Sequence, residues 1–268
     1  MSLLDPIKHA LASVLATSHE VLTSLGAPPG SALTWLACVA VVVVLVRAAM
    51  LPFVVHGVRQ AHAGSRARPH LREVTERYRG RTDAESVRAM VEERRRISAE
   101  HGVSRLGCLP LLVQLPVWIG LYHLLSDVAS GSAVGAMSPA LVSSLGGASV
   151  LGVPLGEHGY LGSGAEHLAV VAGLAAVAAV LSYVTQRHVV LPNTTTEGMP
   201  EAMASAQRLM PTLSAVGIAL SAGVVPVALL AYWVMSSTWT LGQSAVVARW
   251  FPTPGTEAAH RAALRAGS

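Results

Sequence analysis

One charged residue lies inside the first long apolar segment of the chain. Arg47 follows the run from Leu33 to Val46, and apolar residues continue to Val55. A membrane that ended at Arg47 would leave about 15 residues, roughly 22 Å, to cross a hydrocarbon core of about 30 Å. The guanidinium is therefore predicted within the hydrocarbon depth, at a cost of about 2.5–3.5 kcal/mol unless it faces a hydrated cavity between helices. A cation in such a cavity can attract acidic groups.

Polar and aromatic side chains at helical spacing on the later apolar segments predict the other walls of this cavity. The predicted groove is lined by Arg47, Gln114, Trp118, Tyr122, Thr185, Gln186, Trp233, Ser237 and Thr240. No Asp or Glu lies within the depth of these segments, so Arg47 has no internal counter-ion and is available to an acidic guest. The alternative is an arginine that reaches the cytoplasmic headgroups, with serines and threonines in ordinary helix packing.

The overall composition favours the bilayer as solvent. Hydrophobic residues make up 52% of the 268 positions and charged residues 13%, which is too little polar surface for a soluble domain. We expect an all-α polytopic membrane protein with a five-span core over residues 32–248. The predicted spans cover about residues 32–55, 106–128, 167–186, 209–224 and 227–247. Residues 1–27 are expected to form an extracytoplasmic amphipathic helix on the membrane surface, and residues 249–268 a short tail.

The distribution of arginines predicts the orientation. Twelve arginines lie between Gly57 and Arg105, whereas residues 129–166 contain no Lys or Arg. Basic loops remain in the cytoplasm, so the N-terminus is predicted outside and the C-terminus inside. The net charge of +4 comes mostly from this one loop, so it indicates membrane orientation before any nucleic-acid function.

The basic loop, residues 56–105, has the pattern of a cytoplasmic helical hairpin with a break at Gly80. Thr82–Glu85 has the spacing of a capping box, and the pairs Glu73–Arg77 and Glu92–Arg96 are at i,i+4 spacing. Two interpretations stay open: the charges only solvate the hairpin, or they contact lipid, ribosome or substrate.

Signatures of catalysis and cofactor binding are missing from the sequence. Cys38 and Cys108 have no partner at CxxC spacing, and the eleven histidines lack ligand spacing on a common face. The chain has no GxxxxGK, GxSxG or HExxH motif. We therefore expect no enzyme activity, no metal and no cofactor. The N-terminal residues also lack the pattern of a cleaved signal peptide.

Several motifs follow one another along the chain. They are Val46-Arg47 with Leu51-Pro52, then His101–Val103 with Leu106–Pro116 and Gly120–Tyr122, and finally Met210-Pro211, Pro226, Tyr232-Trp233, Ser236 and Gln243. In this order they resemble the YidC/Oxa/Alb family of membrane protein insertases, in its bacterial YidC-like form, and the resemblance runs to about Phe251. The chain departs from the family at Ala228, where a glycine is common, at Thr185 beside Gln186, and in its short tail.

The resemblance implies a five-span fold with a groove open to the cytoplasm and lipid, in which Arg47 attracts acidic client segments. It implies a multi-pass protein of the bacterial plasma membrane that inserts and folds client membrane proteins without ATP. Its partners are then the clients and the bilayer, with the Sec translocon and the ribosome as further candidates, and we expect a monomer. The alternative is a small anion transporter or channel that uses Arg47; it predicts inverted internal repeats, which the sequence does not show.

Overall fold

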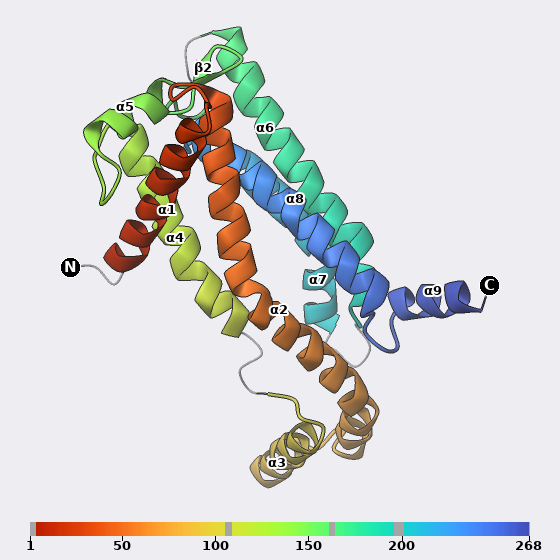
Figure 1. Ribbon diagram of the computed structural model, residues 1–268. Coiled ribbons are helices and arrows are strands. Elements are labelled where there is room, and N and C mark those ends of the chain that lie inside the picture. Colours follow the sequence, from red (N-terminus) through yellow and green to blue (C-terminus); the bar gives the residue numbers. More distant parts are fainter. Residues whose placement is uncertain (1–3, 105–108, 161–163, 196–200, 268) are drawn as a thin grey trace. The chain divides into compact units, whose positions relative to one another are not determined.

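The computed structural model describes residues 4–104, 109–160, 164–195 and 201–267 (Figure 1). In chain order the helices are α1 (Asp5–Ser24), α2 (Ala32–Arg77), α3 (Ala84–Glu100), α4 (Leu109–Ala129), α5 (Pro139–Gly147), α6 (Ala165–Val184), α7 (Glu201–Ser221), α8 (Val227–Trp250) and α9 (Glu257–Ala266). A π-helix (Thr185–Val190) and a 3-10 turn (Leu191–Asn193) follow α6. The chain is nearly all helical, as predicted. The two strands described, β1 (Ser149–Val150) and β2 (Val153–Pro154), form one short hairpin that the sequence did not predict.

Three helical segments in the described part of the chain are long and apolar enough to cross a membrane. They cover Ala32–Arg77, Leu112–Ala129 and Ala165–Asn193, and they overlap the first three predicted spans. The predicted start of the second span at residues 106–108, which includes Cys108, lies outside the described residues. Helices α7 and α8 have 21 and 24 residues and are long enough, but they are not apolar enough to be included, so the five-span core remains a prediction.

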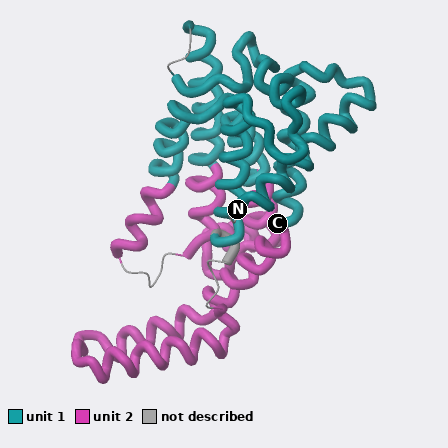
Figure 2. The backbone as a smooth tube through the Cα atoms, turned by 90° about the vertical axis from the view of Figure 1, so that its left-hand side faces the viewer, with its two compact units in different colours: residues 1–49, 111–184, 211–241 teal, residues 50–110, 185–210, 242–268 magenta. Residues whose placement is uncertain are grey.

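The chain forms two compact units (Figure 2). Unit 1 contains residues 1–49, 111–184 and 211–241, and unit 2 contains residues 50–110, 185–210 and 242–268. The core of unit 1 is built from large apolar side chains of α1, α2, α4 and α8. Fully buried members include Leu15, Trp35, Leu124, Leu125, Leu229 and Leu230. Buried residues recur three or four positions apart along α1, α2 and α4, which is the spacing of one buried helix face; they are Leu11 and Leu15, then Trp35, Val39 and Val42, then Leu121, Leu125 and Val128.

Helix α1 packs its apolar face on the rest of unit 1. A Cβ atom added at Gly120 of α4 would lie 2.9 Å from the Ile7 side chain, so only glycine allows this approach. Lys8 Nζ also pairs with Asp127 Oδ2 at 2.6 Å, at the other end of α4. The His19 ring stacks on buried Trp35 with 4.2 Å between ring centroids. These contacts hold α1 against the protein, and its predicted place on the membrane surface stays a prediction.

Backbone carbonyls of the loop before α6 cap the N-terminal end of α8. The first N–H groups of a helix have no partner within the helix. Here Val227 donates its N–H to the Glu157 carbonyl at 2.9 Å, and Ala228 donates to the Leu155 carbonyl at 3.0 Å. Gly159 has φ +66°, and a Cβ atom there would meet the Gly223 carbonyl oxygen at 2.2 Å. The loop therefore needs glycine at this position to reach α8.

In unit 2, α2 runs on to Arg77 and packs against α3 through a small apolar cluster of Ala67, Val74 and Ile97. Two local predictions for this region were wrong. The N-cap of α3 is Asp83, whose side chain accepts from the Ser86 N–H at 2.8 Å, so the cap lies one residue after Thr82.

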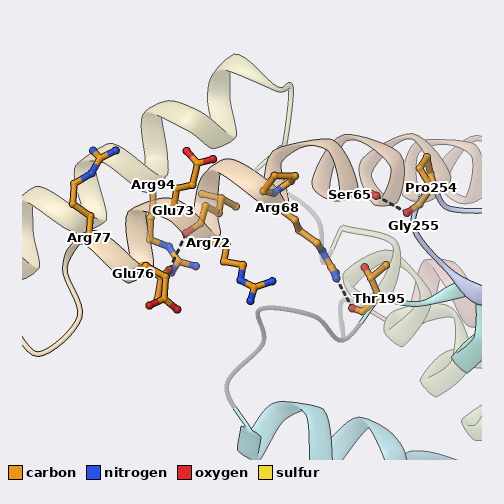
Figure 3. Close-up of a pocket in the computed structure, with 13 residues that line it drawn as sticks. Ser65, Arg68, Arg72, Glu73, Glu76, Arg77, Arg94, Thr195, Pro254 and Gly255 are labelled. Atoms are coloured by element: carbon orange, nitrogen blue, oxygen red, sulfur yellow. Dashed lines mark hydrogen bonds between the residues drawn. The ribbon is translucent and has the colours of Figure 1, made fainter.

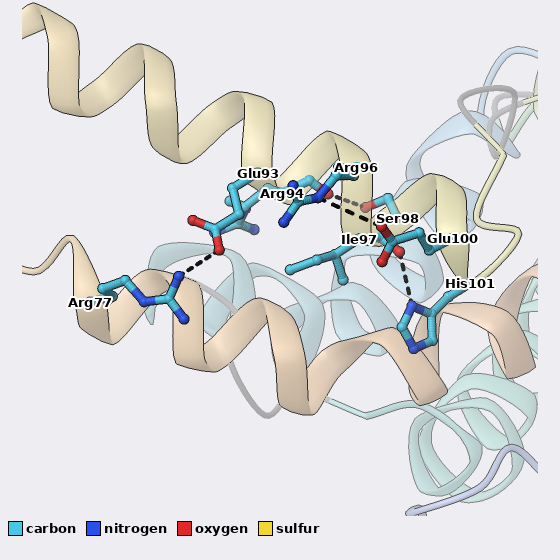
Figure 4. Close-up of polar contacts among 8 residues, drawn as sticks. All are labelled: Arg77, Glu93, Arg94, Arg96, Ile97, Ser98, Glu100 and His101. Atoms are coloured by element: carbon cyan, nitrogen blue, oxygen red, sulfur yellow. Dashed lines mark hydrogen bonds and ion pairs between the residues drawn. The ribbon is translucent and has the colours of Figure 1, made fainter.

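The predicted ion pairs along each helix are also replaced. Arg77 Nη1 pairs with Glu93 Oε1 across the two helices at 2.6 Å, and Arg96 pairs with Glu100 at 3.6 Å, so neither Glu73–Arg77 nor Glu92–Arg96 forms (Figure 4). An i,i+4 pair contributes only about 0.2–0.5 kcal/mol, so the side chains follow the closer partner that helix packing provides.

Candidate functional site

Arg47 lies in unit 1 at the point where α2 meets α8. Its Nη2 donates to the Ser236 hydroxyl at 2.6 Å and lies 3.5 Å from the Ser236 carbonyl oxygen. Ser236 is 9% exposed, and Tyr232, one turn earlier on α8, is 5% exposed and interacts with both Arg47 and Ser236. The guanidinium is thus held by neutral oxygen atoms in a largely buried setting.

The charge of Arg47 has no counter-ion in the part of the chain that the structure describes. Each ion pair there involves a basic residue other than Arg47. A buried charge is costly unless a charged or hydrogen-bonding partner compensates it, and hydroxyl and carbonyl oxygens compensate only in part. The arrangement can accept an anion in exchange for the Ser236 hydroxyl.

The α8 residues chosen from the sequence lie beside this contact without making it. Trp233 packs against the core of unit 1, Ser237 is half-buried, and Thr240 donates its hydroxyl to the Ser236 carbonyl at 2.8 Å. Tyr232 and Ser236 each precede a predicted residue, Trp233 and Ser237, by one position, which is a rotation of about 100° around the helix axis, whereas Thr240 belongs to both faces.

Ser236 and Tyr232 are the residues that the spacing argument missed. Both occur in the motif by which the chain resembles its family, and that was the signal that could have found them.

The α4 residues form an aromatic strip. Trp118 and Tyr122 stack with ring centroids 6.4 Å apart, and Trp118 is 41% exposed while Gln114 is half-buried. The structure shows no hydrogen bond from these three side chains to Arg47 within the described residues. Their place in the groove stays a prediction.

Thr185 and Gln186 belong to unit 2, in the π-helix that follows α6. Thr185 is 3% exposed and Gln186 half-buried. A π-helical segment at the end of an α-helix often marks a functional position. Their membership of the groove is likewise a prediction that this structure does not test.

No cluster of three or more metal-ligating side chains occurs among residues 4–104, 109–160, 164–195 and 201–267. The site is thus a single guanidinium with hydroxyl, phenol and carbonyl oxygens around it. Such a set can bind and release an anionic group, and it contains no nucleophile paired with a general base.

Comparison with known proteins gives one consistent result. Residues 29–254 match the family described as 60Kd inner membrane protein. The chain is 29% identical to the Membrane protein insertase YidC of Streptomyces avermitilis over 256 residues, which are 91% of this chain and 58% of that relative. It is 24% identical to the protein of the same name from Bifidobacterium longum (96% of this chain, 78% of the relative) and 27% to that from Tropheryma whipplei (95% and 86%).

Proposed function

The chain belongs to the 60Kd inner membrane protein family, and from this premise we propose that it inserts client membrane proteins into the lipid bilayer. The observation that carries the proposal is Arg47, a half-buried cation whose described partner is a neutral hydroxyl. An acidic residue of a client segment replaces the Ser236 hydroxyl as the partner of Arg47. A charge-assisted pair with a carboxylate is stronger than a bond to a hydroxyl, so the exchange is favourable for an acidic guest.

The driving force for insertion comes from the client and the membrane. Burying a client helix in lipid yields about 25 cal/mol per Å² of apolar surface. The membrane potential acts on each acidic residue that crosses, with about 2.3 kcal/mol per charge per 100 mV. The protein lowers the free-energy barrier for moving the polar segment of the client across the membrane. Neither apolar burial nor the membrane potential requires a nucleotide.

The groove is proposed to combine Arg47 with the aromatic strip of α4 and the polar face of α8. Trp118 presents an exposed apolar ring along which a client helix can slide toward lipid. We place the protein in the bacterial plasma membrane as a five-span monomer, with the N-terminus outside. Its clients, and the Sec translocon or ribosome as additional partners, belong to the proposal.

The test is protease protection of a single-span client with a short acidic tail, added to liposomes that contain the purified protein. Empty liposomes and liposomes with the Arg47→Glu variant are the two comparisons. We expect protein-dependent protection of the client that falls at least about tenfold in Arg47→Glu, because attraction becomes repulsion. Arg47→Lys, which keeps the charge, should retain most of the protection.

A client with a neutral tail serves as the control for folding. Equal loss of the acidic and the neutral client in Arg47→Glu would show a general folding defect and contradict the role given to Arg47. No gain over empty liposomes for either client would count against autonomous insertion. Anion flux across the same liposomes would then favour the transporter.

A further inference from the structure

A cleft of about 1460 Å³ lies beside the extension of α2 in unit 2 (Figure 3). Its walls come from α2, from α3, and from two short segments around residues 195 and 254. The lining residues are Ser65, Arg68, Pro69, Leu71, Arg72, Glu73, Thr75, Glu76, Arg77, Arg94, Thr195, Pro254 and Gly255. Four arginines and two glutamates among them leave the cleft with an excess of positive charge.

Hydrogen bonds to backbone carbonyls hold the walls together. Ser65 Oγ donates to the Pro254 carbonyl at 2.6 Å, and Arg68 Nη1 donates to the Thr195 carbonyl at 2.6 Å (Figure 3). The Thr253 N–H donates to Asn193 Oδ1 at 2.8 Å, which ties the two short segments to each other. Four segments therefore build one cleft, and α2 supplies most of its charge.

Two of the four arginines keep their charge available. Arg77 is paired with Glu93, and Arg68 is engaged with Thr195. Arg94 donates to the neutral Thr75 hydroxyl at 3.0 Å, and exposed Arg72 makes no ion pair within the described residues. Arg68, Arg72 and Arg94 extend to the same side of α2 (Figure 3). Guanidinium groups arranged in this way match carboxylates or phosphates.

The rest of the lining favours a peptide over a nucleic acid. Pro69, Leu71 and Pro254 add apolar surface, which suits the side chains of a peptide. None of the described lining residues is aromatic, so this part of the cleft offers no ring on which a base can stack.

The position along α2 disfavours a lipid headgroup. With Val55 as the predicted inner end of the first span, Arg72 lies 17 residues, about 25 Å, further along the helix. The headgroup region extends only about 5–8 Å beyond the hydrocarbon core on each side. A ligand in this cleft is therefore expected to be water-soluble.

We infer that the cleft binds an acidic segment of a partner protein, with carboxylates on Arg72 and Arg94 and apolar side chains against Leu71 and Pro254. The inference goes beyond the proposed function, since it concerns other residues and does not depend on insertion. It assigns to the basic α2–α3 region a defined docking site, in addition to the general effect of its charge on orientation.

The test measures binding of a fluorescein-labelled peptide of alternating Glu and Leu to the full chain in nanodiscs of zwitterionic lipid. Fluorescence anisotropy should show saturable binding that Arg72→Glu weakens about tenfold or more. Arg72→Lys and the second variant, Arg94→Gln, should show smaller losses. Arg88→Glu is the matched control, because Arg88 is exposed on α3, lies outside the cleft and undergoes the same charge change. It should alter binding less than about twofold.

Three results would overturn the inference. The first is no saturable peptide binding by the unaltered protein. The second is an equal loss in Arg72→Glu and Arg88→Glu, which indicates diffuse charge attraction. The third is tighter binding of a single-stranded RNA of similar charge, weakened by the same Arg72 variant, which assigns the cleft to nucleic acid. Arg72 is exposed, so the Arg72 variants should keep the helical circular dichroism of the parent. If Arg72→Glu does not fold, the loss of peptide binding in Arg94→Gln tests the inference instead. The Arg47→Glu insertion assay remains interpretable whichever result is obtained.

Discussion

The contact between Arg47 and Ser236 makes a prediction with two parts. Replacing Ser236 by Ala removes a hydroxyl that accepts a charged hydrogen bond at 2.6 Å. Such bonds contribute about 1.5–3 kcal/mol, and the longer contact to the Ser236 carbonyl at 3.5 Å recovers little of this. Arg47 keeps some exposure, so water replaces part of the lost bond. We expect a loss of about 1–2 kcal/mol in the free energy of unfolding, a factor of roughly 5–30 in the unfolding equilibrium.

The second part concerns clients. Ser236 and a client carboxylate compete for the same guanidinium, so removal of the hydroxyl leaves Arg47 more available. Ser236→Ala should therefore insert an acidic client at least as well as the parent protein, whereas Arg47→Glu should not. A substitution that lowers stability and preserves insertion is the expected signature of this competition.

The assay for stability is equilibrium unfolding in mixed micelles, followed through the fluorescence of the five tryptophans. Ser237→Ala is the matched control: it is the next residue on α8 and changes the same group, and within the described residues the side-chain hydrogen bonds of Arg47 go to Ser236. Both variants gain the same helix propensity, so their difference reports the bond to Arg47. If the free energies of unfolding of Ser236→Ala and Ser237→Ala agreed within about 0.3 kcal/mol, the energetic argument would be refuted. A fall in acidic-client insertion as large as that of Arg47→Glu would refute the competition.

Three further predictions follow from local geometry. Gly159→Ala places a Cβ atom 2.2 Å from the Gly223 carbonyl oxygen at a positive φ; we expect a loss of about 1–3 kcal/mol and faster proteolysis of the loop before α6. The hydrogen bond from the Ser86 N–H lowers the pKa of Asp83. The cap therefore stabilises α3 at neutral pH, and this stability is lost as the pH falls below about 4 and through the lowered pKa. The helical signal of α3 should decrease over the same pH range. Val74→Ala should destabilise the packing of α2 on α3 by about 1–3 kcal/mol, measured by amide hydrogen exchange in α3.

Each of these has its own control. A Cβ atom added at Gly146 would meet no atom within 4 Å, so Gly146→Ala should leave the loop protected from protease. Asp83→Asn keeps a capping side chain without a titrating group, and the acid-dependent loss of helix should shrink in this variant. Val87 is 41% exposed, and Val87→Ala should change exchange rates little. Exchange in α3 that is equally fast in Val74→Ala and Val87→Ala would contradict the packing argument.

Much of the fold could be predicted because apolar runs and breaks are local properties of the chain. The segments that became α2, α4 and α6 were visible as apolar runs of sufficient length. The boundaries were harder. Helix α2 continues to Arg77 through Pro52 and Pro69, because a helix tolerates proline when neighbouring groups satisfy the freed carbonyls.

Local pairing rules failed where tertiary packing offered a better partner. Arg77 pairs with Glu93 of the facing helix, 16 residues away, and leaves Glu73 on its own helix. The energy of an i,i+4 pair is a few tenths of a kcal/mol, so the approach of α3 decides the outcome. The cleft in unit 2 is a stronger case, since Arg68, Thr195 and Pro254 have no spacing in the sequence that could relate them.

The sequence by itself determined that Arg47 is exceptional, because a charge within an apolar run needs compensation wherever it lies. It also determined the helical class and the family, through motifs that follow one another along the chain. Only the tertiary structure decided which oxygen holds the guanidinium. Ser236 and Ser237 differ by about 100° around the α8 axis. The packing of buried side chains sets the rotation of α8 and so determines that Ser236, 189 residues from Arg47 in the sequence, faces the guanidinium.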